Sequence, residues 1–109
     1  MPFTSSLALH DPEVDATIPC FRVVDESGAP IKGAEDLCEA MGKKVVTGLY
    51  TTMVRLNAMD NILYDAQRQG RISFYMTSFG EEAAVVGSAA AFDMSDTMFG
   101  QYREAGALM

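Results

Sequence analysis

The sequence predicts an α/β fold that is incomplete as a domain, built from an extended arm, a long helix, a helix of small residues and a short parallel strand. Residues 1–19 hold three of the four prolines and show no periodicity. Apolar side chains recur every three or four positions from 37 to 63, and residues 83–91 are all Ala, Val, Gly or Ser. The 109 residues correspond to one globular unit, since single domains cluster near about 100–150 residues.

The N-terminal part begins as an extended arm over residues 1–19, which we expect to be poorly ordered. Residues 20–24 (CFRVV) are typical of a short strand, because apolar and β-branched side chains dominate the run. Residues 25–30 (DESGAP) are nearly all turn formers. A hairpin or tight turn should therefore follow the strand.

The strongest signal is the apolar face of the long helix. Its pattern is clean from residue 44 to 69, a break is expected near Gly42, and Gly70 stands where a left-handed cap would end the helix. We expect the charged residues Arg55, Asp60, Asp65 and Arg68 to form a solvated face. The expected apolar face consists of Leu37, Met41, Val45, Leu49, Met53, Leu56, Met59 and Leu63.

The elements after the long helix are short. Residues 72–77 are apolar but too few for a helix, and a second helix is expected from Glu81 to Ala91. The adjacent Glu81 and Glu82 are explained by the positive end of that helix, and the small residues behind them let neighbouring backbones approach closely. A turn at 93–96, a strand at 97–99 and a polar loop at 100–106 complete the prediction.

Two features indicate that the chain is part of something larger. The helix over 44–69 would be roughly 39 Å long at 1.5 Å per residue, more than a compact unit of this size requires. A new apolar segment begins at Ala107, two residues before Met109. We therefore expect a partial gene product or a truncated form.

Charge and composition exclude several classes of function. The net charge of −7 argues against nucleic-acid binding and against an anionic membrane surface, and no apolar run reaches the roughly 18 residues of a spanning helix. Cys20, Cys38 and His10 are too few for a tetrahedral zinc site, and two reduced cysteines are favoured over a disulfide. No glycine-rich nucleotide loop is present, and the first twenty residues, with no Lys or Arg, show no signal or transit peptide.

The candidate site is Gln101-Tyr102-Arg103, which follows the predicted strand at 97–99. Loops at strand ends are where ligands bind in α/β folds. The planar arginine fork suits phosphate oxygens, and a tyrosine hydroxyl adds a neutral donor. The residues alone leave open the alternative that Tyr102 and Arg103 are a surface pair without function.

Five segments carry a resemblance to a known family: 18–25 (IPCFRVVD), 68–77 (RQGRISFYMT), 80–83 (GEEA), 87–91 (GSAAA) and 99–106 (FGQYREAG). They resemble the alpha subunits of branched-chain 2-oxo acid dehydrogenases, over residues 18–109. The resemblance implies the N-terminal portion of a thiamine diphosphate-binding fold, with residues 20–109 as part of the alpha-subunit domain. It also implies that Tyr102 and Arg103 contact the cofactor diphosphate, and that Phe74 and Gln101 line the pocket for the branched side chain.

The same resemblance implies an activity and its partners. The activity is that of 3-methyl-2-oxobutanoate dehydrogenase (2-methylpropanoyl-transferring), which decarboxylates branched-chain 2-oxo acids and passes the acyl group to lipoyl. The implied partners are a beta subunit and the lipoyl acyltransferase core, in the mitochondrial matrix, with no nucleic acid or membrane. No catalytic residue or magnesium ligand is expected in this chain: the Gly-Asp-Gly-type metal motif is absent, and the catalytic glutamate belongs to the beta subunit. The chain alone should therefore be inactive.

Two alternatives to this assignment remain at this point. One is the alpha subunit of another thiamine-dependent dehydrogenase, acting on pyruvate or acetoin, although a smaller residue at Phe74 would have favoured it. The other is a non-catalytic acidic helical interaction module.

Overall fold

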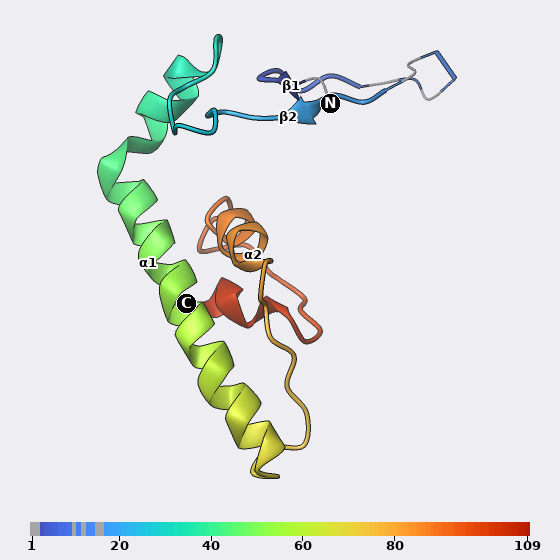
Figure 1. Ribbon diagram of the computed structural model, residues 1–109, viewed down its shortest axis with the longest axis vertical. Coiled ribbons are helices and arrows are strands. Elements are labelled where there is room, and N and C mark those ends of the chain that lie inside the picture. The colour runs from blue at the N-terminus through green and yellow to red at the C-terminus, as the bar shows by residue number, and fades with distance from the viewer. Residues whose placement is uncertain (1–2, 10, 12, 15–16) are drawn as a thin grey trace. The chain divides into compact units, whose positions relative to one another are not determined.

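The computed structural model describes residues 3–9, 11, 13–14 and 17–109. The chain forms two compact units, residues 1–42 and 43–109 (Figure 1). His10 lies outside the described residues. None of the described helices is both long enough and apolar enough to cross a membrane.

The first unit contains two short strands. Strand β1 (Phe3–Thr4) pairs in parallel with β2 (Cys20–Phe21), and the amide of Arg22 extends the ladder by donating to the Thr4 carbonyl at 2.8 Å. Phe3–Thr4, the part of the predicted arm that lies in β1, is therefore extended and ordered by pairing. An extended segment leaves its backbone donors and acceptors free, and a parallel neighbour satisfies them.

The predicted turn after β2 is confirmed. Val24 and Pro30 form an antiparallel bridge, and the amide of Asp25 donates to the Ala29 carbonyl at 2.8 Å. The Asp25 carboxylate accepts the amides of Ser27 and Ala29 at 2.8 and 3.0 Å, which closes the turn. Cys20 and Cys38 are free thiols, as the sequence predicts.

The long helix α1 (Glu35–Arg68) is confirmed, together with both of its predicted boundaries. Gly42 has φ 63° and ψ 155°, which interrupts the helix where the sequence predicts a break. Gly70 has φ 71°, and the Arg71 amide donates to the Ala66 carbonyl at 3.0 Å. This is the bond that closes a glycine-capped helix end.

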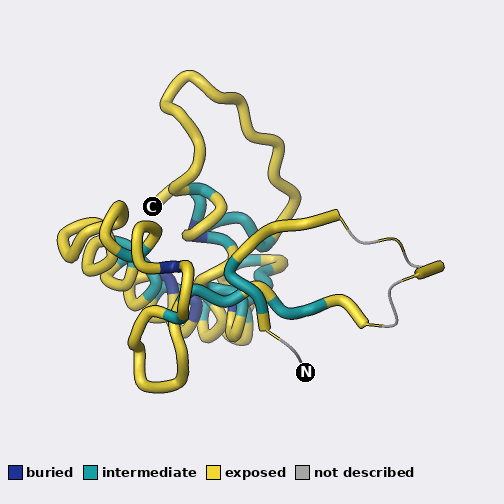
Figure 2. Tube along the Cα trace, turned by 90° about the horizontal axis from the view of Figure 1, so that it is seen from above, coloured by how far each residue is buried: buried dark blue, intermediate teal, exposed yellow. Residues whose placement is uncertain are grey.

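The second unit is held together by small residues. Helix α2 (Glu82–Ala89) packs against the short 3₁₀ helix η1 (Glu104–Leu108). Leu56 of α1 is fully buried, and Val86 of α2 and Gly106 of η1 are also buried (Figure 2). A Cβ atom at Gly106 would lie only 2.5 Å from the Leu56 side chain. The close approach is therefore made at Gly106 of η1, whereas nothing lies within 4 Å of the Cβ position of Gly87 in the small-residue helix.

The predicted strand at 97–99 is wrong. Residues 97–100 have no regular structure, and Phe99 is 95% exposed. The described part of the second unit offers no strand for this segment to pair with, so its backbone has no ladder to join. The parallel pair in the structure is instead β1 with β2, and part of the predicted polar loop at 100–106 belongs to η1.

The prediction of a solvated charged face is also wrong for Asp60. Its side chain is completely buried, and its carboxylate accepts the Tyr75 hydroxyl and the Ser78 amide, each at 2.5 Å. A buried carboxylate is costly unless hydrogen bonds satisfy it, and these two bonds do so. Asp60 therefore ties α1 to the segment that follows it.

Replacing Gly106 by Ala should destabilise the second unit. The added methyl group would collide with Leu56, and overpacking of this kind costs about 1–3 kcal/mol. Gly48→Ala is the matched control, because nothing lies within 4 Å of its Cβ position and alanine is favoured in a helix interior by up to about 1 kcal/mol. Urea unfolding followed by circular dichroism should separate the two variants, and equal stability would contradict the packing.

Stability should fall at alkaline pH because of Tyr75. Burial, followed by the hydrogen bond to Asp60, raises the pKa of Tyr75 to about 12. The unfolded value is about 10, so the stabilisation is complete below pH 10 and is lost as the pH rises toward 12. The urea midpoint should drop between pH 10 and pH 12 in the parent chain. Tyr75→Phe should flatten this part of the profile, and an unchanged profile would argue against the hydrogen bond of the Tyr75 hydroxyl to Asp60.

Candidate functional site

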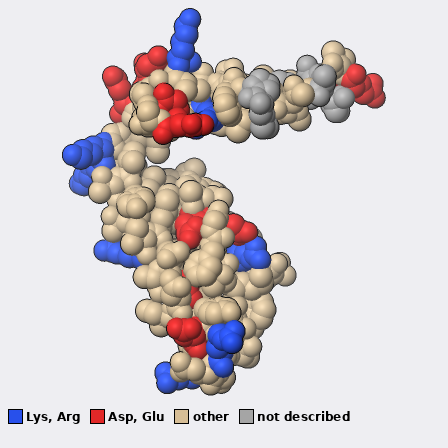
Figure 3. Space-filling view, in the orientation of Figure 1, with Lys and Arg blue, Asp and Glu red and all other residues tan. Residues whose placement is uncertain are grey.

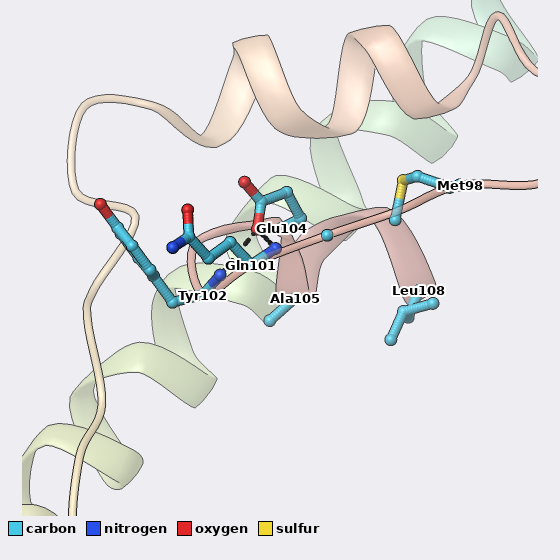
Figure 4. A pocket seen from close by; sticks show the side chains of 7 residues that line it. Met98, Gln101, Tyr102, Glu104, Ala105 and Leu108 are labelled. Atoms are coloured by element: carbon cyan, nitrogen blue, oxygen red, sulfur yellow. Dashed lines mark hydrogen bonds between the residues drawn. The ribbon is translucent and has the colours of Figure 1, made fainter.

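Residues 100–104 form a loop that folds around one carboxylate. Oε2 of Glu104 accepts the amide of Gln101 at 2.8 Å and the amide of Tyr102 at 2.9 Å (Figure 4). The Gln101 amide makes the largest contribution to lowering the pKa of Glu104. The loop conformation is therefore fixed by its own side chain just before η1 begins.

Arg103 is oriented by an ion pair with the start of α2. Its Nη1 atom lies 2.7 Å from Oε1 of Glu81, and the two side chains are 37% and 45% exposed. Its Nε atom is buried and has no hydrogen-bond partner in the described part of the chain. A buried donor without an acceptor is unusual, and an anionic oxygen could pair with this atom only after the residues that cover it had moved aside.

Tyr102 connects Arg103 with Phe74. The guanidinium carbon of Arg103 lies 5.9 Å from the centre of the Tyr102 ring. The rings of Tyr102 and Phe74 meet edge to face, with centroids 6.2 Å apart and an interplanar angle of 87°. Three residues singled out from the sequence thus lie together, although Phe74 is 59% exposed.

A pocket of about 320 Å³ opens beside the loop. Gln101 and Tyr102 line it, whereas Phe74 and Arg103 do not. Figure 4 shows Glu104 and Ala105 of η1 on the same pocket as the loop. The full lining consists of Met98, Gly100, Gln101, Tyr102, Glu104, Ala105 and Leu108.

Two donors near this loop are of the kind that bind anionic oxygens. Arg103 offers a buried, unpartnered Nε–H, and the Tyr102 hydroxyl is on the adjacent residue. The local charge is less favourable for an anion, because Glu81 pairs with Arg103 and a second carboxylate, Glu104, accepts the backbone amides of the same loop. The described residues contain no group of three or more His, Cys, Asp or Glu side chains that could hold a metal ion. Figure 3 shows acidic and basic groups of the described residues interspersed on one face, without a broad basic area.

The roles of two carboxylates at this site, Glu81 and Glu104, were not predicted from the sequence. The helix dipole accounts for both Glu81 and Glu82 in the sequence, but Glu81 binds Arg103, and Glu82 accepts the Gly80 amide at 2.9 Å. Glu104 was not singled out at all. A signal for it existed, because a glutamate three residues after a loop residue can reach back to that residue's amide, as in a capping box.

Comparison with known proteins places these residues in a family. Residues 50–109 match the family described as dehydrogenase E1 component. The chain is 57% identical over 107 residues to the 2-oxoisovalerate dehydrogenase subunit alpha, mitochondrial, of Dictyostelium discoideum, covering 98% of this chain and 23% of that protein. The protein of the same name from Homo sapiens is 53% identical, with 98% and 24% covered. The 2-oxoisovalerate dehydrogenase subunit alpha 2, mitochondrial, of Arabidopsis thaliana is 42% identical, with 98% and 22% covered.

The chain spans about a quarter of the length of these curated relatives. The resemblance inferred from the sequence segments is confirmed at the level of the family. The helix-rich architecture with one pair of parallel strands is consistent with part of such a domain. Because the family match covers more than half of the chain, including Tyr102 and Arg103, the chain belongs to the dehydrogenase E1 component family.

Proposed function

We propose that this chain is part of the alpha subunit of a mitochondrial branched-chain 2-oxo acid dehydrogenase. The relatives named as 2-oxoisovalerate dehydrogenase alpha subunits support this function through 42–57% identity over 107 residues. In this proposal residues 20–109 belong to the thiamine diphosphate-binding domain and residues 1–19 form an arm. The partners are a beta subunit and a lipoyl acyltransferase core, and the substrates are branched-chain 2-oxo acids.

Arg103 and Tyr102 are proposed to contact the diphosphate of thiamine diphosphate. The observation that carries this proposal is the buried Nε of Arg103, which has no acceptor within the described residues. A diphosphate oxygen would supply that acceptor, and the Tyr102 hydroxyl would add a second, neutral donor. Glu81 already binds Nη1, so it leaves the Nε side of the guanidinium for the ligand.

The cofactor would supply the carbanion chemistry of decarboxylation, while this chain binds and orients. Gln101 lines the pocket beside Tyr102, and Phe74 meets the Tyr102 ring at its edge. We propose that both side chains help to form the pocket for an isopropyl or isobutyl group. An exposed aromatic ring suits this role, since it offers a large apolar surface to a branched chain.

Arg103→Ala should weaken thiamine diphosphate binding in the complete alpha subunit assembled with its beta subunit. A charge-assisted hydrogen bond contributes roughly 1.5–3 kcal/mol, so the dissociation constant should rise about ten- to a hundredfold. Arg103→Lys should restore part of the affinity, because a point charge cannot reproduce the planar fork. Tyr102→Phe should have a smaller effect than Arg103→Ala. Calorimetric titration provides the measurement, and parent-like binding by Arg103→Ala would refute the contact.

Phe74→Ala should relax substrate selectivity without changing cofactor affinity. Removing the ring takes apolar contacts from a branched side chain, and a lost contact of this size changes discrimination by about 10–200-fold. The ratio of kcat/KM for 2-oxoisovalerate to that for pyruvate provides the measurement. Phe99→Ala is the control, since Phe99 is 95% exposed and makes no ring contact in the described structure. An unchanged ratio in Phe74→Ala would show that Phe74 does not contact the substrate side chain.

A further inference from the structure

Asp60 lies 42 positions before Tyr102 in the sequence, yet two series of contacts connect its carboxylate to Tyr102 and Arg103. Both oxygens of this carboxylate are used, and the side chain is completely buried in α1. Each oxygen starts a separate series. All the residues concerned belong to the second unit.

The first series is made of hydrogen bonds and ends at Arg103. Oδ2 of Asp60 accepts the Ser78 amide at 2.5 Å. The Ser78 carbonyl accepts the Glu81 amide at 2.8 Å, which fixes the residue that precedes α2. The Glu81 carboxylate then binds Nη1 of Arg103 at 2.7 Å. The position of Ser78 thus sets the place from which Glu81 reaches Arg103.

The second series passes through aromatic side chains and ends at Tyr102. Oδ1 of Asp60 accepts the Tyr75 hydroxyl at 2.5 Å, which fixes the backbone on one side of Phe74. The Phe74 ring meets the Tyr102 ring edge to face at 6.2 Å. Edge-to-face pairs depend on orientation, so a displaced Phe74 would also release Tyr102.

We propose that Asp60 is a positioning residue for the Tyr102–Arg103 pair. It touches neither residue and acts through Tyr75 and Ser78, on either side of the segment 76–77. The effect of Asp60 on the binding of thiamine diphosphate rests on the proposed function, whereas its effect on the conformation of the loop that carries Tyr102 and Arg103 does not. A carboxylate that only stabilised the fold would lower stability without acting specifically through Arg103.

The first arm of the test is a double-mutant cycle in the complete alpha subunit assembled with its beta subunit. Asp60→Asn preserves volume but leaves one neutral acceptor oxygen in place of two charged ones, which weakens the bonds to the Tyr75 hydroxyl and the Ser78 amide, so the dissociation constant of thiamine diphosphate should rise about tenfold. Tyr75→Phe cuts one series only and should raise it about threefold. Val86→Ala is the control: it removes buried apolar contacts on α2, outside both series, and should leave the constant unchanged.

The decisive comparison adds Asp60→Asn to the variant that lacks both side chains, Tyr102→Ala with Arg103→Ala. If Asp60 acts through this pair, the triple variant should bind cofactor about as weakly as Tyr102→Ala with Arg103→Ala alone. Losses that multiply would overturn the proposal. Should Asp60→Asn fail to fold, Tyr75→Phe with Tyr102→Ala asks the same question of the second series, and losses that multiply there would again overturn it.

The second arm is independent of the cofactor. Amide hydrogen exchange of residues 100–106 should be about tenfold faster in Asp60→Asn than in Val86→Ala, because the loop loses its orientation. Equal exchange in the two variants would overturn the positioning role. If exchange responds but Arg103→Ala binds cofactor normally, the positioning role stands and the proposed diphosphate contact fails.

Discussion

The second unit depends on a carboxylate buried where water cannot reach it. Removing a carboxylate from water costs several kcal/mol, and only hydrogen bonds of good geometry offset that cost. Asp60 meets this requirement with the Tyr75 hydroxyl and the Ser78 amide. If either donor moved away, a buried oxygen would be left unsatisfied. The segment after α1 is therefore held in one place, although residues 72–78 form no helix or strand.

Helices and turns could be predicted because their causes are local. The spacing of apolar residues, the breaks at Gly42 and Gly70, and the turn formers after β2 all act within a few residues of each other. The strand at 97–99 could not be predicted in the same way. A strand requires a neighbour, and local composition does not contain that information. Pairing of β1 with β2 was missed for the same reason, because the partners are seventeen positions apart.

The environment of Asp60 was also beyond the reach of the sequence. A charged residue on a long helix is usually solvated, and its two partners lie 15 and 18 positions later. Tyr102 and Arg103 were found because an arginine beside a tyrosine suits an anionic ligand by itself. The roles of their neighbours Glu81 and Glu104 were not found, since the helix dipole already explains a glutamate at the start of a helix. Residues with unusual chemistry could therefore be identified from the sequence, whereas the residues that hold them in position could not.

The residues that hold Arg103 and its loop in place are carboxylates, so the site orients its hydrogen-bond donors but carries little net positive charge. Surface ion pairs contribute only about 0–1 kcal/mol, so the half-exposed pair of Arg103 with Glu81 adds little stability. Its effect is geometric: it directs one edge of the guanidinium toward α2 and leaves the buried Nε without an acceptor. Glu104 likewise fixes the geometry of the loop, because its carboxylate accepts two backbone amides. Both carboxylates reduce the local positive charge, so they orient donors at the expense of electrostatic attraction. A diphosphate bound here would therefore be recognised by the direction of its hydrogen bonds more than by net charge.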